Sequence, residues 1–143
     1  YGYVYTAQLA LSANPAQTIK AIAEAEAYNG PSLLICYAPC ELHGIKGGMN
    51  HCQDVLKSAV KSGYWNLFSF NPELKMQGKN PFTLSSRAGD GSYQDFLNNE
   101  TRYSALKRKF PERGELLFAK NEQSASDRFK HLQRLVELYK PAE

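Results

Sequence analysis

The strongest constraint on the fold is a strand–helix–strand pattern in the first 38 residues. Residues 3–11 alternate in the way a strand does, which places on one face Tyr3, Tyr5, Ala7, Leu9 and Leu11. Asn14-Pro15 predicts the start of a helix, and Asn29-Gly30-Pro31 predicts its end. Residues 32–38 (SLLICYA) are almost continuously apolar, which is typical of a strand covered on both faces in a parallel sheet. The pattern predicts a βαβ unit with a right-handed crossover, and hence an α/β fold.

The predicted helices carry apolar residues at helical spacing. The stripes are Ile19, Ile22, Ala23 and Ala27 in the first helix, Cys52, Val55, Leu56, Ala59 and Val60 in the second, and Ala125, Phe129, Leu132, Val136 and Tyr139 in the last. Residues 64–71 predict a strand, residues 71–81 a turn-rich connection, and residues 82–86 a short extended piece. Ser92 and Asp95 have the spacing of a capping box, which predicts one helix holding Phe96, Tyr103, Leu106 and Phe110 and ending before Pro111.

Composition and charge exclude several classes of protein. The 17 basic and 14 acidic residues leave a net charge of +3, too small a surplus to indicate nucleic-acid binding. The surplus lies in residues 100–143, where mixed signs at helical spacing favour a solvated face over a docking surface for an acidic partner. The longest apolar run is far shorter than the roughly 20 residues of a membrane span. An odd number of cysteines favours a reducing, cytoplasmic setting over a secreted disulfide framework.

The chain opens with Tyr1, in strand-like sequence and with no signal peptide before it. We therefore expect a piece of a longer protein.

Cys40 is the first candidate for chemistry. It follows the apolar strand behind Pro39, and in an open α/β sheet ligands collect outside the carboxyl ends of the strands. From the residues alone two interpretations stay open, a small buried cysteine and a ligand or nucleophile. Cys36 lies within the strand and Cys52 on a helical apolar stripe, so we predict both to be core residues.

Three further patterns have the outline of a ligand site. A zinc site formed by the cysteines with His43 and His51 is disfavoured, because residues four apart on a strand lie ~13 Å apart. Gly89-Asp90-Gly91 followed by Asn121 has the outline of a thiamine diphosphate motif, but we predict a polar turn for the first part and a helix around Asn121. The loop Gly44–Gly48 opens a helix, so its amides and Lys46 could face an anion, although a flexible loop is the simpler interpretation.

Five segments carry a resemblance in order along the chain. They are YGYVYTAQLAL, PSLLICYAPCELHGIKGGM, QDVLKSAVKSGYW, NPELKMQGKNPF and FLNNETRYSALKRKFP, of which AVKSGYW and GKNPF are the most specific. Together they resemble the C-terminal part of the pyruvate:ferredoxin (flavodoxin) oxidoreductases. The resemblance implies that residues 1–88 are the second half of a thiamine diphosphate-binding α/β domain, with part of its parallel sheet, and that residues 89–143 are a C-terminal helical segment.

The resemblance also implies an activity and a site. Enzymes of this family are homodimers that decarboxylate pyruvate on thiamine diphosphate with Mg²⁺ and form acetyl-CoA from CoA. They pass two electrons singly through three [4Fe-4S] clusters to ferredoxin or flavodoxin. By this resemblance Cys40 is the fourth ligand of the cluster nearest the thiamine, while the other three ligands and the true thiamine motif lie upstream of residue 1. Cys36 and Cys52 match no ligand, and His43 receives no role.

Two hypotheses of different classes follow. The first is a fragment of a thiamine- and iron–sulfur-dependent 2-oxoacid oxidoreductase, inactive by itself. The second is a non-catalytic metal- or redox-binding module on a related α/β scaffold. In both, neither nucleic acid nor a membrane is an expected partner.

Overall fold

The computed structural model describes residues 2–40, 42 and 44–141, and its centre is a four-stranded mixed sheet. The strands are β1 (Tyr5–Leu9), β2 (Ser32–Cys36), β3 (Phe68–Phe70) and β4 (Phe82–Leu84), in the spatial order β2-β1-β3-β4. β1 and β2 are parallel, whereas β3 pairs antiparallel with both β1 and β4. The predicted α/β class is confirmed, with one parallel pair in a sheet that is otherwise antiparallel.

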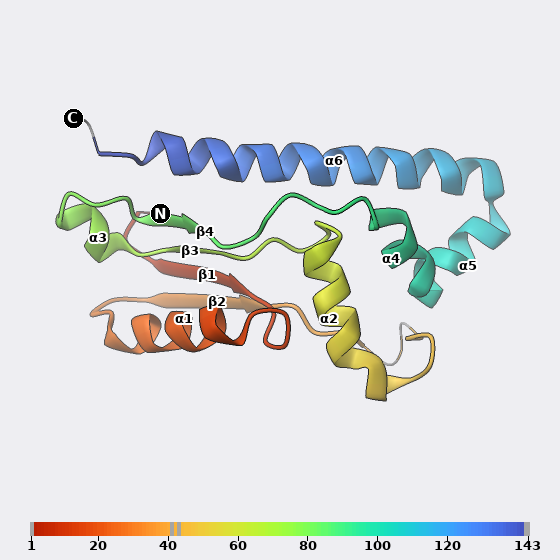
Figure 1. The fold of residues 1–143 in the computed structure, drawn as a ribbon, viewed down its shortest axis with the longest axis horizontal. Helices are drawn as coiled ribbons and strands as arrows, with labels where there is room; N and C mark the ends of the chain where they lie inside the picture. Colours follow the sequence, from red (N-terminus) through yellow and green to blue (C-terminus); the bar gives the residue numbers. More distant parts are fainter. Residues whose placement is uncertain (1, 41, 43, 142–143) are drawn as a thin grey trace.

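Helices lie on both sides of this sheet (Figure 1). They are α1 (Pro15–Ala27), the 3-10 turn η2 (Met49–His51), α2 (Cys52–Lys61), α3 (Pro72–Met76), α4 (Tyr93–Asn99), α5 (Thr101–Lys109) and α6 (Pro111–Leu138). α1 packs on β1 and β2, while the long α6 runs past β4, at the opposite edge of the sheet from β2. Within the described residues, none of these helices has the length and apolarity needed to cross a membrane.

The predicted βαβ unit is present. The Asn14 side chain accepts a hydrogen bond from the Gln17 amide at 3.0 Å and so caps α1, whose first residue is Pro15. Tyr5, Ala7 and Leu9 are buried beneath α1 as the alternation predicts. Tyr3 and Leu11 are exposed, because β1 is shorter than the predicted strand.

The predicted stripe of α1 is wrong. Ile19 and Ile22 are 68% and 49% exposed, and the helix turns Thr18 and Ala21 toward the sheet instead. The large Tyr5 and Leu9 side chains fill the space below α1, so small residues allow the helix to approach closely.

The prediction that residues 32–38 are covered on both faces is also wrong for this chain. β2 is an edge strand, and Leu33 and Ile35 are exposed because α6 lies beside β4, at the far edge of the sheet. Cys36 is likewise exposed and is not a core residue.

The elements after the βαβ unit agree only in part with those predicted from the sequence. Val55, Leu56 and Ala59 are buried as the stripe of α2 predicts, and Cys52 lies half-buried against the same core. The strand predicted for residues 64–71 is reduced to β3, and residues 71–81 contain the unpredicted helix α3, capped by Asn71.

The helix predicted to start at Ser92 is instead two helices. α4 and α5 are separated at Glu100, whose backbone is extended (φ −89°, ψ 118°). The Ser92 side chain does not cap α4; its hydroxyl donates to Asp90. The stripe of α6 is confirmed, with Ala125 and Leu132 buried and the remaining members partly buried.

Candidate functional site

The segment Tyr37–Cys40 leaves the carboxyl end of β2, beside the carboxyl end of β1. The two strands are parallel and in register from Tyr5–Ser32 to Leu9–Cys36, so their carboxyl ends meet at one edge of the sheet. Cys40 lies here outside helix and strand, half-buried and with a free thiol. Glu41 and His43 lie outside the described residues, so the structure does not bear on His43.

Tyr37 fixes the start of this segment. Its amide donates to the Leu9 carbonyl at 3.0 Å, and the Trp65 indole Nε1 donates to the same carbonyl at 2.9 Å. The Tyr37 ring lies 5.5 Å from the Trp65 ring and 6.0 Å from the Tyr64 ring, measured between centroids. Three residues before Cys40, the chain is therefore held by the end of β1 and by two aromatic side chains.

The loop Gly44–Gly48 fixes the chain after Cys40. The Thr101 amide donates to the Gly44 carbonyl at 3.3 Å, and the Thr101 hydroxyl donates to the same oxygen. Ile45 forms an isolated antiparallel bridge with Glu100 and is buried in the core beside α4. The glycine-rich loop is therefore tied to the start of α5 rather than free.

Tyrosine hydroxyls and a carboxylate gather next to Tyr37. The Tyr64 and Tyr103 hydroxyls are 2.8 Å apart, and Glu100 is buried. Burial raises the pKa of Tyr37 well above its usual range, and the negative charge of Glu100 raises that pKa further. Burial also raises the pKa of Tyr64, assisted by its hydrogen bond with Tyr103. At neutral pH the Tyr37 and Tyr64 hydroxyls are therefore uncharged hydrogen-bonding groups. No sequence pattern marks this cluster, because its members come from separate segments of the chain.

The cysteines are not gathered into one site. Cys36 is exposed on β2, and Cys52 begins α2 against the core. No group of three or more His, Cys, Asp and Glu side chains among residues 2–40, 42 and 44–141 is arranged to hold a metal ion. The donor chemistry of Cys40, a free thiol at a strand end, suits one ligand of an iron–sulfur cluster. A complete ligand set would need donors beyond the described residues.

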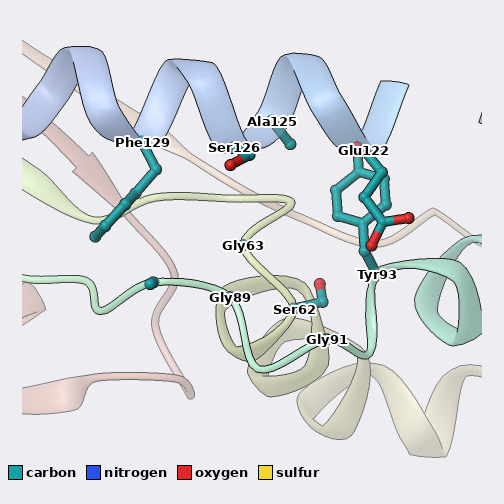
Figure 2. A pocket seen from close by; sticks show the side chains of 10 residues that line it. Ser62, Gly63, Gly89, Gly91, Tyr93, Glu122, Ala125, Ser126 and Phe129 are labelled. Atoms are coloured by element: carbon teal, nitrogen blue, oxygen red, sulfur yellow. The ribbon is translucent and has the colours of Figure 1, made fainter. Parts of the chain in front are cut away.

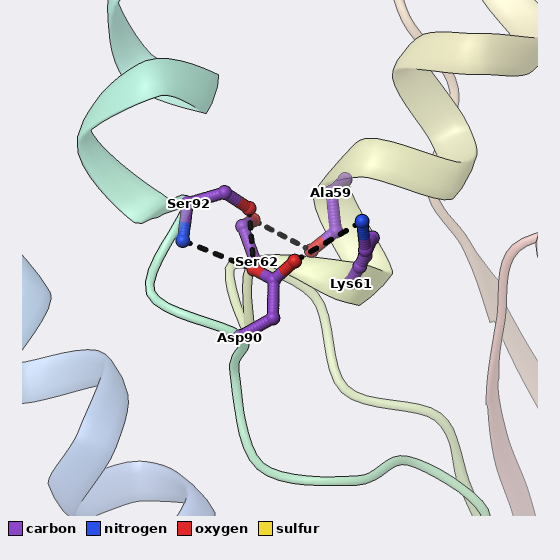
Figure 3. Close-up of polar contacts among 5 residues, drawn as sticks. All are labelled: Ala59, Lys61, Ser62, Asp90 and Ser92. Carbon is purple, nitrogen blue, oxygen red and sulfur yellow. Dashed lines mark hydrogen bonds and ion pairs between the residues drawn. The ribbon is translucent and has the colours of Figure 1, made fainter.

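The pattern Gly89-Asp90-Gly91 forms the polar turn that the sequence predicts, and Asn121 lies within α6. The Asp90 carboxylate accepts hydrogen bonds from the Ser92 amide at 3.0 Å and the Ser92 hydroxyl at 2.5 Å, and it lies 3.3 Å from the Lys61 ammonium (Figure 3). These contacts, led by the Ser92 hydroxyl, lower the pKa of Asp90 to about 2. Asp90 thus ties the end of α2 to the start of α4.

A cavity of about 210 Å³ lies between this turn and α6 (Figure 2). Gly89 is needed in its wall, because a Cβ there would lie 2.5 Å from the Ser62 carbonyl oxygen. The carboxylate that lines the cavity belongs to Glu122, and it already accepts a hydrogen bond from the Gln94 side chain at 2.6 Å. None of the residues singled out as ligands lines this cavity, so the Cys40 segment remains the candidate site.

Comparison with known proteins gives one consistent result. No family model matches the chain. The chain is 49% identical over 137 residues to a pyruvate:ferredoxin oxidoreductase of Moorella thermoacetica, which covers 96% of this chain and 12% of that protein. It is 50% and 46% identical, over 136 residues in each case, to pyruvate-flavodoxin oxidoreductases of Enterobacter agglomerans and Klebsiella pneumoniae, covering 95% of this chain and 12% of each. The chain thus spans about an eighth of the length of these curated relatives.

Proposed function

This chain corresponds along nearly its whole length to one segment of the pyruvate:ferredoxin and pyruvate-flavodoxin oxidoreductases, and on that premise we propose that its role is to supply Cys40 to a [4Fe-4S] cluster. The single observation that supports this role is the position of Cys40. It is the cysteine that follows a parallel strand at the carboxyl edge of the sheet, in a segment held on both sides. Thiolates are the usual ligands of such clusters.

The residues around Cys40 have a defined task in this proposal. Hydrogen bonding, burial and solvent exposure set the potential of an iron–sulfur cluster. The Tyr37 ring packs against the Tyr64 and Trp65 rings, and this partly buried aromatic cluster holds the start of the segment. The bound cluster would accept and release single electrons, and this chain would orient one of its thiolate ligands.

The reaction of the whole enzyme belongs to the proposal too. Pyruvate and CoA would be converted to acetyl-CoA and CO₂, and the two electrons released would pass to ferredoxin or flavodoxin. Thiamine diphosphate, Mg²⁺ and the remaining cluster ligands would be bound by other parts of the parent protein, so this chain alone would be inactive.

The same proposal divides the chain and assigns its neighbours. Residues 1–88 would complete a thiamine diphosphate-binding domain, and residues 89–143 would form a helical segment packed on it through α2 and α4. The exposed apolar side chains of β2 support contact with the remainder of the parent protein. A homodimeric, cytoplasmic enzyme is part of this proposal. The alternative of a non-catalytic redox module is not favoured, because each relative named above is an oxidoreductase.

The test is made in the full-length parent enzyme. Cys40→Ala and Cys40→Ser are expected to lose the iron and sulfide of one cluster and the pyruvate-dependent reduction of ferredoxin or flavodoxin. Cys36→Ala and Cys52→Ala are the matched controls and should keep both. Both controls should act mainly through packing, each lowering the free energy of unfolding by roughly 1 kcal/mol. Full iron content in Cys40→Ala, or equal losses in all three alanine variants, would refute the assignment.

A further inference from the structure

We infer that Thr101 is a positioning residue for the Cys40 ligand, an inference that rests on the proposed function. Thr101 is the first residue of α5, 57 residues after Gly44 in the chain, and it binds the Gly44 carbonyl through both its amide and its hydroxyl. A segment that carries a metal ligand gains precision when partners outside the ligand set hold it. Thr101 in this way holds the chain at Gly44, four residues after Cys40.

Gly44 and Thr101 fit each other closely. The Gly44 backbone has φ +69°, a conformation that glycine adopts without strain. A Cβ at this position would lie 2.6 Å from the Thr101 Oγ1 and 2.7 Å from its Cβ. The contact therefore depends on glycine at one side and on a short hydroxyl side chain at the other.

The neighbouring residues Ile45 and Glu100 strengthen the contact between the loop and the start of α5. Ile45 bridges Glu100 through the backbone and is only 8% exposed, within the core cluster of α2, α4 and α6. This bridge requires the extended backbone of Glu100, the same feature that separates α4 from α5. The break between these helices thus presents Glu100 and Thr101 side by side to the loop.

The chain is consequently held at one point before Cys40 and at one point after it. Tyr37 is bound to the end of β1 three residues before Cys40, and Gly44 is bound to α5 four residues after it. The first attachment belongs to the sheet and the second to the helical segment. The geometry links the C-terminal helices to the position of the ligand, although no side chain of those helices is proposed to bind the cluster.

The experiment compares hydroxyl and non-hydroxyl side chains at Thr101 in the full-length enzyme. Thr101→Val removes the hydroxyl and keeps the branched shape, whereas Thr101→Ser keeps the hydroxyl. Ser104→Ala is the matched control, because the Ser104 hydroxyl bonds the Thr101 carbonyl at 3.3 Å on the same helix and is not bonded to the loop. The measurements are iron retained during titration with a chelator, and the reduction potential and EPR spectrum of each cluster.

Thr101→Val should lose the iron of one cluster at about tenfold lower chelator concentration, at the low end of the range for losing a contact that orients a metal ligand. The EPR signal or potential of that cluster should change while those of the other clusters stay as in the wild type. Thr101→Ser and Ser104→Ala should behave like the wild type. Thr101→Ala provides the same comparison if Thr101→Val does not fold, since alanine is well tolerated in helices.

Unchanged cluster properties in both non-hydroxyl variants would overturn the inference, and so would equal losses in Thr101→Val and Thr101→Ser. Both results leave the proposed function standing if Cys40→Ala still loses its cluster. Retention of every cluster in Cys40→Ala would instead overturn the proposed function, whatever Thr101 does.

Discussion

The exposed edge strand β2 predicts that the 143-residue chain associates with itself. Ser32–Cys36 carries none of the lysines, prolines or bulges that protect natural edge strands, and its outer edge has no partner strand among the described residues. Leu33 and Ile35 add apolar surface on the face that α6 leaves open. We expect two copies to pair through β2, and Leu33→Lys to weaken that pairing.

The size of the effect follows from the exposure of Leu33. Burying a leucine side chain completely contributes ~1.5–3 kcal/mol. Leu33 is 50% exposed, so covering the exposed half should contribute about 1 kcal/mol per copy, or about 2 kcal/mol for two copies. Leu33→Lys should therefore raise the dissociation constant roughly 30-fold, before any repulsion between the new charges is added.

Sedimentation equilibrium or light scattering over a range of concentrations measures this directly. Leu116→Lys is the control, because Leu116 is 69% exposed on α6, a helix that contacts β4 at the opposite edge of the sheet from β2. If association is a general property of the exposed apolar side chains, both substitutions should weaken it equally. If the copies pair through β2, only Leu33→Lys should weaken it. A wild-type chain that stays at 16.0 kDa at high concentration would refute the reasoning altogether.

Two other predictions concern the acid range and the cluster. The lowered pKa of Asp90 makes its interactions stabilising above the ordinary value of 3.8, and this contribution is lost as the pH falls toward about 2. The urea midpoint of the wild type should accordingly fall more than that of Asp90→Asn between about pH 5 and about pH 2; parallel losses would count against the Lys61–Asp90–Ser92 link. For the chain alone, anaerobic reconstitution with iron and sulfide should leave no stoichiometric [4Fe-4S] cluster, since the described residues supply one candidate ligand, Cys40. A brown product containing equal iron and sulfide would contradict this.

Local signals predicted much of the fold. Asn14-Pro15 fixes the start of α1 because both residues act within one helical turn. The predicted side of α1 was wrong because periodicity identifies an apolar stripe without saying which residues fit the sheet below it. Ile19 and Leu33 are apolar at positions where this chain provides no cover. Under the proposed function, their burial pattern reflects contacts with the rest of the parent enzyme.

The candidate site, too, could be predicted from the sequence only in part. Cys40 could be singled out from sequence, because the rule that ligands gather at the carboxyl ends of strands needs only a strand and the residue that follows it. The contact between Thr101 and Gly44 could not, since it joins distant segments and depends on a helix break at Glu100. Helical periodicity runs through that position and favours one continuous helix. Departures from local preference concentrate at functional sites, where another interaction compensates for them. At Glu100 the compensation is the bridge to Ile45, which links the break in the helices to the segment that carries Cys40.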